Sequence, residues 1–437
     1  MHNTPPCGGK GLCAECAKRA TCARNDFVAL TTDAPVGGWI GVTGVAGAGI
    51  GDGCFDIVVD IGTTTLAFAL LQGGRVLYTH ARANSQRAFG HDVISRIQAA
   101  GDGRSRALYD RIHADLRDGT AQLLAEAGTV ADNVRTFVVA GNTTMLHLLT
   151  GTDCTTLGQF PFTPVFLDGR VIEDSPVGIP MTLLPGISAF VGADIVAGLL
   201  YCAGLGKSRW LLIDLGTNGE IAFSTPDGIW VTAAAAGPAF EAANISCGMP
   251  GVPGAVAHAV CEDGRFAVKT IGNAPPVGLC GSGVLDVAAQ LVRHGLVDET
   301  GGMADAYFET GVPITDRIHF TQQDLRELQL AKSAIRTGIE LLLSEAGASC
   351  HEVEAVYLAG GLGHALSQES AFDLGLLPRA FAGKTVAAGN TALAGGIASL
   401  GAPTENLENI VRTAKELQLA THPRFNDAFL THIMFEK

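Results

Sequence analysis

Positive charge is scarce in this sequence of 437 residues. Lys and Arg number 29 against 43 Asp and Glu, which gives a formal net charge of −14 at pH 7. No Lys/Arg cluster offers the phosphate-neutralising surface that binding to nucleic acid requires. The composition therefore excludes nucleic acid as a partner, and it leaves open which protein binds.

Long hydrophobic runs are also missing, although hydrophobic residues make up 47% of the chain. No stretch of about 18 or more apolar residues is free of charge or glycine, as a membrane-spanning helix requires. The strongest candidate, residues 187–205, contains Asp194 and several glycines, and we interpret it as a tightly packed buried helix. The N-terminus lacks the apolar core of a signal peptide, so we expect a cytoplasmic protein without membrane contact.

Two similar stretches organise what is present. Residues 56–65 read DIVVDIGTTT, and residues 211–220 read LLIDLGTNGE. Each has an apolar run typical of a buried strand, then an Asp, and then a turn that contains Gly. Backbone amides and hydroxyl groups in such turns can donate to phosphate oxygens. The predicted phosphate-binding residues are Gly62, Thr63, Thr64 and Thr65 in the first stretch and Gly216, Thr217, Asn218 and Gly219 in the second.

Three acidic residues in these stretches are the predicted catalytic groups. Asp60 and Asp214 end the two strands, where Mg²⁺ bridging the phosphates would need hard oxygen ligands. Glu220 follows the second turn directly, where a carboxylate could orient the water that attacks the nucleotide, and an ordinary surface position in a strand is its alternative. The two stretches are about one domain length apart, which predicts two facing lobes that clamp a nucleotide.

A third glycine pair, Gly360 and Gly361 in VYLAGGLG, completes the pattern. Together the three segments resemble the phosphate-1, phosphate-2 and adenosine loops of the acetate and sugar kinase, heat-shock ATPase and actin superfamily. This resemblance implies an α/β fold of two actin-like lobes, each a copy of an RNase H-like domain, with ATP and Mg²⁺ between them. The glycine pair would let the backbone pack against adenine and ribose.

The N-terminal segment, residues 1–26, concentrates four thiols in a stretch too short to bury a core: Cys7, Cys13, Cys16 and Cys22. In a reducing compartment such an array indicates a metal site rather than disulfides. Its first three members resemble the loop around a plant-type [2Fe–2S] iron–sulfur cluster. The fourth follows almost at once, so [4Fe–4S] suits the array at least as well, and zinc is a further alternative. We expect a Gly-rich linker over residues 27–54.

Many further segments resemble, in the same order, the ATPase module of the reductive activators of corrinoid-dependent enzymes. They include GHDVISRI, GNTTMLHLLTG, FVGADIVAG, GPAFEAANISCGM and GNTALAGG, and the resemblance runs from about residue 55 to the C-terminus. Family members usually carry an N-terminal [2Fe–2S] ferredoxin domain, whereas this chain has only the Cys-rich loop and a shorter linker. We expect the two lobes at residues 55–205 and 206–437.

The resemblance implies ATP hydrolysis coupled to the transfer of one electron. Such activators return the cobalt(II) of a corrinoid protein to cobalt(I), and the partner here would be the corrinoid protein of a methyltransferase system. The electron would pass through the iron–sulfur cluster from an unidentified donor. Ser246, in a Gly- and Pro-rich loop, would lie nearest the corrinoid, and a homodimer is one expected assembly.

Three other functions fit the pattern less completely. A small-molecule kinase of the same fold would leave the Cys array unexplained, and no sugar-specific signature is present. A nucleotide-gated binding module would use the Cys array as a zinc site. An activator of another low-potential enzyme, such as a 2-hydroxyacyl-CoA dehydratase, would hold its cluster between two subunits.

Local patterns predict several elements around these motifs. Residues 104–127 and 321–347 have the apolar periodicity of long amphipathic helices, the second with a capping box at its start. Asn142 is well placed to cap a helix. We also expect residues 412–435 to form an amphipathic helix interrupted by one proline.

Overall fold

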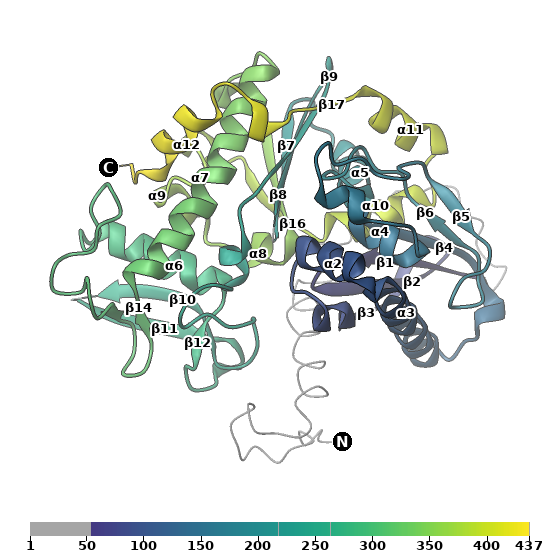
Figure 1. Ribbon diagram of the computed structural model, residues 1–437, viewed down its shortest axis with the longest axis horizontal. Coiled ribbons are helices and arrows are strands. Elements are labelled where there is room, and N and C mark those ends of the chain that lie inside the picture. The colour runs from purple at the N-terminus through teal and green to yellow at the C-terminus, as the bar shows by residue number, and fades with distance from the viewer. Residues whose placement is uncertain (1–53, 217, 263, 437) are drawn as a thin grey trace.

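The computed structural model describes residues 54–436 with the exception of 217 and 263. Two six-stranded sheets form the centres of two lobes that lie side by side (Figure 1). The predicted Cys-rich segment and nearly all of the predicted linker lie outside the described residues, so both stay predictions.

The first lobe is built on the apolar run that precedes the first predicted phosphate turn. Ile57, Val58 and Val59 are fully buried, as expected for a strand covered on both faces. Their strand pairs antiparallel with the next strand of the chain and parallel with the strand that follows the long helix. In spatial order the sheet contains β3 (Arg75–Ala83), β2 (Thr65–Gln72), β1 (Phe55–Ile61), β4 (Val134–Gly141), β6 (Met181–Leu183) and β5 (Arg170–Ile172).

The second lobe repeats this plan around the second predicted turn. Leu211, Leu212 and Ile213 are fully buried, and their strand again pairs antiparallel with the next strand and parallel with a later one. In spatial order the sheet contains β16 (Thr385–Gly389), β15 (Ala355–Ala359), β7 (Trp210–Leu215), β8 (Gly219–Thr225), β9 (Gly228–Ala234) and β17 (Ala414–Glu416).

The two sheets share one topology over five of their six strands, while the sixth, β5 in one sheet and β17 in the other, joins opposite ends of this pattern. In each lobe three antiparallel strands are followed by two parallel strands, and the first strand of the lobe lies in the middle. This is the arrangement of a duplicated RNase H-like domain, so the predicted actin-like α/β fold is confirmed for the described residues.

Two helices of small residues pack against each other at the junction of the lobes (Figure 1). They are α5 (Ala193–Ala203) and α10 (Thr391–Ser399). A Cβ atom on Gly395 would lie 1.8 Å from the Ala197 carbonyl oxygen, so only glycine allows the two helices to approach this closely. Because α10 follows β16 of the second sheet yet also contacts β1 of the first, it joins the lobes.

The remaining long helices cover the sheets and agree with the predicted periodicity. The helix predicted over residues 104–127 is α3 (Ser105–Ala127), and the one predicted over 321–347 is α7 (Gln322–Glu345) with Thr321 and Asp324 in the expected capping box. The other helices are α2 (Val93–Ala99), α4 (Thr143–Thr150), α8 (Gly360–Ala365), α9 (Gln368–Asp373), α11 (Thr404–Thr413) and α12 (Phe425–Ile433).

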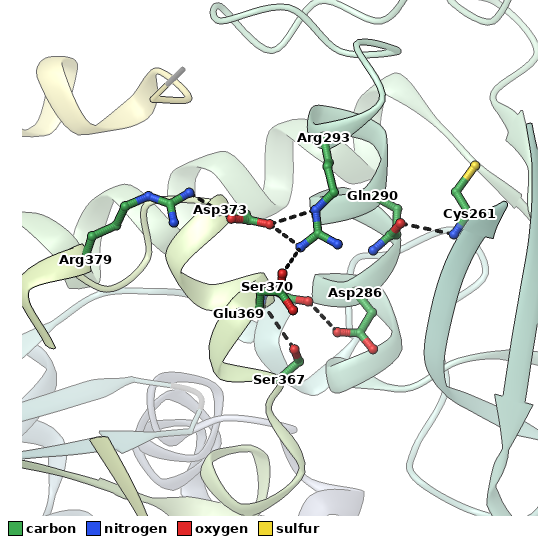
Figure 2. A network of polar contacts seen from close by, with 9 residues as sticks. All are labelled: Cys261, Asp286, Gln290, Arg293, Ser367, Glu369, Ser370, Asp373 and Arg379. Carbon is green, nitrogen blue, oxygen red and sulfur yellow. Dashed lines mark hydrogen bonds and ion pairs between the residues drawn. The ribbon is translucent and has the colours of Figure 1, made fainter. Parts of the chain in front are cut away.

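A small subdomain extends from the far end of the second lobe (Figure 1). A polar network ties its helix to α9 of the lobe: Arg293 pairs with Glu369 and Asp373, and Ser370 donates to Asp286 at 2.7 Å (Figure 2). The subdomain consists of β10 (Ala255–Glu262), β11 (Arg265–Thr270), β12 (Gly278–Leu279), α6 (Gly281–Arg293), β13 (Val312–Pro313) and β14 (His319–Phe320).

The C-terminal tail differs from the predicted interrupted helix. Residues 414–416 form β17, which pairs in parallel with β9, and the helical parts are the end of α11, a 3-10 turn at Leu419–Thr421 and α12. Lys415 lies over the Trp230 ring, 4.9 Å from its centroid. Pairing with the edge strand β9 therefore determines the conformation of residues 414–416, where the helical pattern of the sequence is weak. No helix among the described residues has the length and apolarity to cross a membrane.

Candidate active site between the two lobes

The first predicted phosphate loop connects β1 with β2 and is held by side chains from three other segments, one of which is Asn84, whose Nδ2 donates to Gly62 O at 3.0 Å. Gly62 N donates to Thr65 O at 3.0 Å, which closes the turn. The side chain of Asn142 donates to Thr63 Oγ1 at 3.1 Å while its oxygen caps α4, as predicted. Arg96 donates to Thr63 O at 2.6 Å. The loop is thus fixed in one shape, as a binding loop for a small anion needs to be.

The second predicted loop connects β7 with β8 and is the counterpart of the first. Gly216 N donates to Asn218 O at 3.0 Å. Gly219 is buried, and a Cβ atom there would lie 1.8 Å from Ile335 of α7, so close packing is sufficient to explain this glycine. Asp214 and Glu220 are direct cross-strand partners, which places both side chains on one face of the sheet. Thr217 is not among the described residues.

The third predicted loop touches the second. β15 pairs with β7 so that Ala359 lies beside Asp214, and Gly360 begins α8 immediately afterwards. Gly360 has a φ of +81°, and a Cβ atom on it would lie 2.6 Å from Asp214 Oδ1. Gly361 next to it is exposed, and a Cβ atom there would meet nothing within 4 Å. The glycine pair therefore combines one tightly packed position with one open position.

Four half-buried acidic side chains from both lobes gather where these loops meet, and we call Asp60, Asp194, Asp214 and Glu220 the carboxylate cluster. Burial raises the pKa of Asp60 and of Asp214 to about 7, and repulsion by neighbouring carboxylates adds to both shifts. Burial also raises the pKa of Asp194 to about 6 and holds the pKa of Glu220 well above its usual range. Such a concentration of like charge marks a place where a cation would be strongly favoured.

A hydrogen bond across the lobe junction reaches the carboxylate cluster. Asn390 Nδ2 donates to Asp60 Oδ2 at 2.7 Å, and the same side chain caps α10 through Leu393 N. Asn142 plays the matching part for α4 on the other side of the first loop. The two asparagines stand in the same sequence context, AGNT at residues 140–143 and 388–391. The sequence interpretation missed the role of Asn390, and this short repeat is the signal that could have indicated it.

The carboxylate cluster suits a metal ion that arrives with its ligand. In the part of the chain that the structure describes, no three His, Cys, Asp or Glu side chains are arranged to hold a metal directly. Mg²⁺ commonly takes only one or two carboxylates and completes its coordination with water and phosphate oxygens. The residues present therefore fit a magnesium–nucleotide complex better than a resident metal.

Ser246, the predicted partner-facing residue, lies in the loop between the short helix Pro238–Glu241 and β10. Its side chain is exposed, and both its backbone N and its hydroxyl donate to Asp324 at the start of α7, at 2.6 and 2.7 Å. The loop that carries Ser246 is thus anchored at the N-terminus of a long helix. The four predicted cluster-ligating cysteines, Cys7, Cys13, Cys16 and Cys22, fall outside the described residues.

Comparison with known families matches almost all of the described chain. A family model described as the RACo middle region matches residues 55–207, and one described as the C-terminal domain of RACo, the ASKHA domain, matches residues 208–437. The chain belongs to the RACo family. The predicted resemblance to reductive activators is thereby confirmed.

Individual relatives agree with this membership. The corrinoid activation enzyme RamQ of Eubacterium limosum is 34% identical over 417 residues, which cover 87% of this RACo chain and 70% of RamQ. The [Co(II) methylated amine-specific corrinoid protein] reductase of Methanosarcina barkeri is 28% identical over 306 residues, 63% of this chain and 54% of that protein. A solved structure, the reductive activator for corrinoid, iron-sulfur protein, superposes with a TM-score of 0.76 at 30% identity, covering 87% of this chain and 66% of the other.

Proposed function

We propose that this protein is an ATP-dependent reductive activator that returns a corrinoid protein from cobalt(II) to cobalt(I). The observation that carries the proposal is the carboxylate cluster between two equivalent loop-bearing strands, in a chain of the RACo family. The relatives that match are an enzyme of corrinoid activation and a reductase of a cobalt(II) corrinoid protein. A cytoplasmic location belongs to the same proposal.

The nucleotide-binding part follows from the loops. Backbone amides and hydroxyls of Thr63, Thr64 and Thr65, with those of residues 217–219, would donate to the phosphates, while the amides of Gly62 and Gly216 close the two turns. Asp60 and Asp214 would hold Mg²⁺ through its water ligands. The open position at Gly361 leaves room for adenosine beside the backbone.

Hydrolysis requires an oriented water and an acceptor for its proton. Water attacks the γ-phosphorus, the bond to the bridging oxygen breaks, and ADP, phosphate and a proton are released. Glu220 is the proposed acceptor because it is the cross-strand partner of Asp214 on β7 and β8, and burial raises its pKa, which makes its carboxylate a stronger base. Asp194, at the start of α5, also belongs to the carboxylate cluster. Its charge contributes to the raised pKa values of the other three acids.

The redox part is proposed from the Cys array. Cys7, Cys13, Cys16 and Cys22 would hold an iron–sulfur cluster, which supplies single electrons from a low-potential donor. Cobalt(II) accepts one electron and becomes cobalt(I). For a one-electron step about 59 mV uphill costs a factor of ten in the equilibrium constant, so a gap of about 300 mV corresponds to roughly 7 kcal/mol. Coupling to ATP hydrolysis offsets a cost of this size.

Ser246 is proposed to face the corrinoid. Ser246 is an exposed residue in a loop whose backbone N and hydroxyl are both fixed to Asp324, so the loop can present a defined surface to a partner. The same loop continues from the short helix at residues 238–241 of the second lobe, within the GPAFEAANISCGM segment.

An anaerobic reduction assay tests the proposal. The full chain, reconstituted with iron and sulfide, is mixed with a cobalt(II) corrinoid protein of a methyltransferase system and a titanium(III) reductant, and cobalt(I) absorbance is followed. We expect the signal to rise with MgATP and to stay at background without it. Asp214→Asn should abolish the ATP-dependent part while leaving the iron content unchanged. An equal signal with and without ATP would refute the proposal.

A further inference from the structure

Arg96 of α2 is a charged side chain that the proposed mechanism does not use. It is among the largest fully buried side chains of the protein, with 0% exposure. Its guanidinium donates to Thr63 O at 2.6 Å, to Gly90 O at 3.0 Å, to the sulfur of Met145 at 3.2 Å and to Gln86 Oε1 at 3.5 Å. Every one of these acceptors is uncharged.

This environment is unusual for a buried cation. None of the ion pairs formed within the described residues includes Arg96, although a buried charge without an opposite charge costs free energy. Burial lowers the pKa of Arg96 to about 10, while the more distant carboxylates of Asp92, Asp115 and Glu241 act in the opposite direction. The fold therefore keeps a positive charge next to the first phosphate loop without fully neutralising it.

The contact with the first loop has a direct electrostatic consequence. The carbonyl of Thr63 and the N–H of Thr64 belong to the same peptide group, so donation to Thr63 O polarises the Thr64 N–H. A polarised N–H is a stronger donor to an anion. Gly90 O, the second strong contact, ties the same guanidinium to the segment that leads into α2, so the charge is held in place.

A charge of the opposite lobe also acts on Arg96. Glu241, in the short helix Pro238–Glu241 of the second lobe, is one of the carboxylates whose charge acts on the guanidinium. That helix begins the segment that carries Ser246. The guanidinium therefore contacts the first phosphate loop and is also affected by a charge at the base of the proposed partner loop.

We propose that Arg96 is a positioning residue for the phosphates of the nucleotide, which it favours by orienting and polarising the first phosphate loop. The inference rests on the proposed nucleotide site. A bound triphosphate would provide the negative charge that the protein itself does not place against this guanidinium. The affinity for adenosine, which has no phosphates, would not depend on Arg96.

Binding of MgATP, MgADP and adenosine to the full chain tests the role by isothermal titration calorimetry. For Arg96→Met we expect the affinity for MgATP and MgADP to fall about tenfold or more, the scale of one charge-assisted hydrogen bond, and the affinity for adenosine to change less than about twofold. Arg96→Lys keeps the charge but loses the planar fork, so its loss for the phosphorylated ligands should be smaller. Arg135→Met is the control for loss of an arginine from the same lobe, because Arg135 pairs with Asp56 near the start of β1, at the opposite end of that strand from the loop.

Each outcome decides between the inference and the proposed function. A purely structural role predicts that Arg96→Met weakens the binding of all three ligands equally or behaves like Arg135→Met, and either result would overturn the inference alone. If Arg96→Met does not fold, Arg96→Lys decides, and wild-type affinity for MgATP in that variant would overturn it. If the wild-type protein shows no measurable binding of MgATP or MgADP, the proposed function and this inference are both overturned.

Discussion

The substitution Gly360→Ala tests how closely the third loop packs on the carboxylate cluster. Gly360 has a φ of +81°, and a Cβ atom there would lie 2.6 Å from Asp214 Oδ1 and 2.8 Å from Leu215 O. The left-handed conformation costs a non-glycine residue about 1–2 kcal/mol. Overpacking against the Leu215 carbonyl, which belongs to a central strand, adds about 1–3 kcal/mol. We therefore expect the free energy of unfolding to fall by about 2–5 kcal/mol.

The same methyl group should also disturb the chemistry, because it displaces the Asp214 carboxylate. We expect ATP hydrolysis by Gly360→Ala to fall at least about tenfold. Gly361→Ala is the matched control for stability, since Gly361 is exposed and a methyl group there meets no protein atom within 4 Å. Urea unfolding without nucleotide, followed by circular dichroism, compares the two variants, and hydrolysis by Gly360→Ala is compared with the wild type. Equal stability of the two variants, or wild-type hydrolysis by Gly360→Ala, would show that the packing argument is wrong.

Three further predictions follow from the carboxylate cluster and the Cys array. The pKa values of Asp60 and Asp214 in the folded protein are about 7, above the ordinary value of 3.8. Between these two values the folded state therefore binds more protons than the unfolded state. The free energy of unfolding of the ligand-free protein should fall as pH rises from 3.8 to about 7. Calorimetry should show a smaller loss in Asp60→Asn, and an identical pH dependence in the two proteins would contradict the assignment. Asn390→Asp keeps a cap for α10 but replaces the hydrogen-bond donor to Asp60 by an acid. ATP hydrolysis should therefore fall about tenfold, with little change in melting temperature. Unchanged hydrolysis at limiting Mg²⁺ would refute the proposed role of Asn390. Replacing Cys13 and Cys16 by Ser should remove iron and cobalt reduction but leave basal ATP hydrolysis, and zinc in place of iron in the reconstituted wild type would contradict the redox role.

The sequence predicts the two lobes because each depends on a local pattern. The apolar runs before Asp60 and Asp214 are long enough to indicate central strands, and the turns after them have few alternatives. The capping residues of α4 and α7 are equally local, and both were predicted correctly. Local signals of this kind survive because tertiary packing reinforces them.

The parts that were missed depend on residues far apart in the chain. Asn390 lies 330 positions from Asp60, so no spacing rule connects them. Arg96 reads as an ordinary polar position in a short helix, and only the fold places its guanidinium under Thr63. The strand at 414–416 was predicted as helix, because the sheet edge that it completes is formed by β9, far earlier in the sequence.

The most direct test of the account measures how far cobalt reduction goes, not how fast. With the corrinoid protein and a reductant buffered at a fixed potential, the final fraction of cobalt(I) is compared for hydrolysable MgATP and a non-hydrolysable analogue. We predict that only hydrolysable MgATP raises the fraction above the level that the reductant sets, and that Asp214→Asn removes the increase. An increase with the analogue, or one that persists in Asp214→Asn, would contradict the claim that hydrolysis between the two lobes drives the electron.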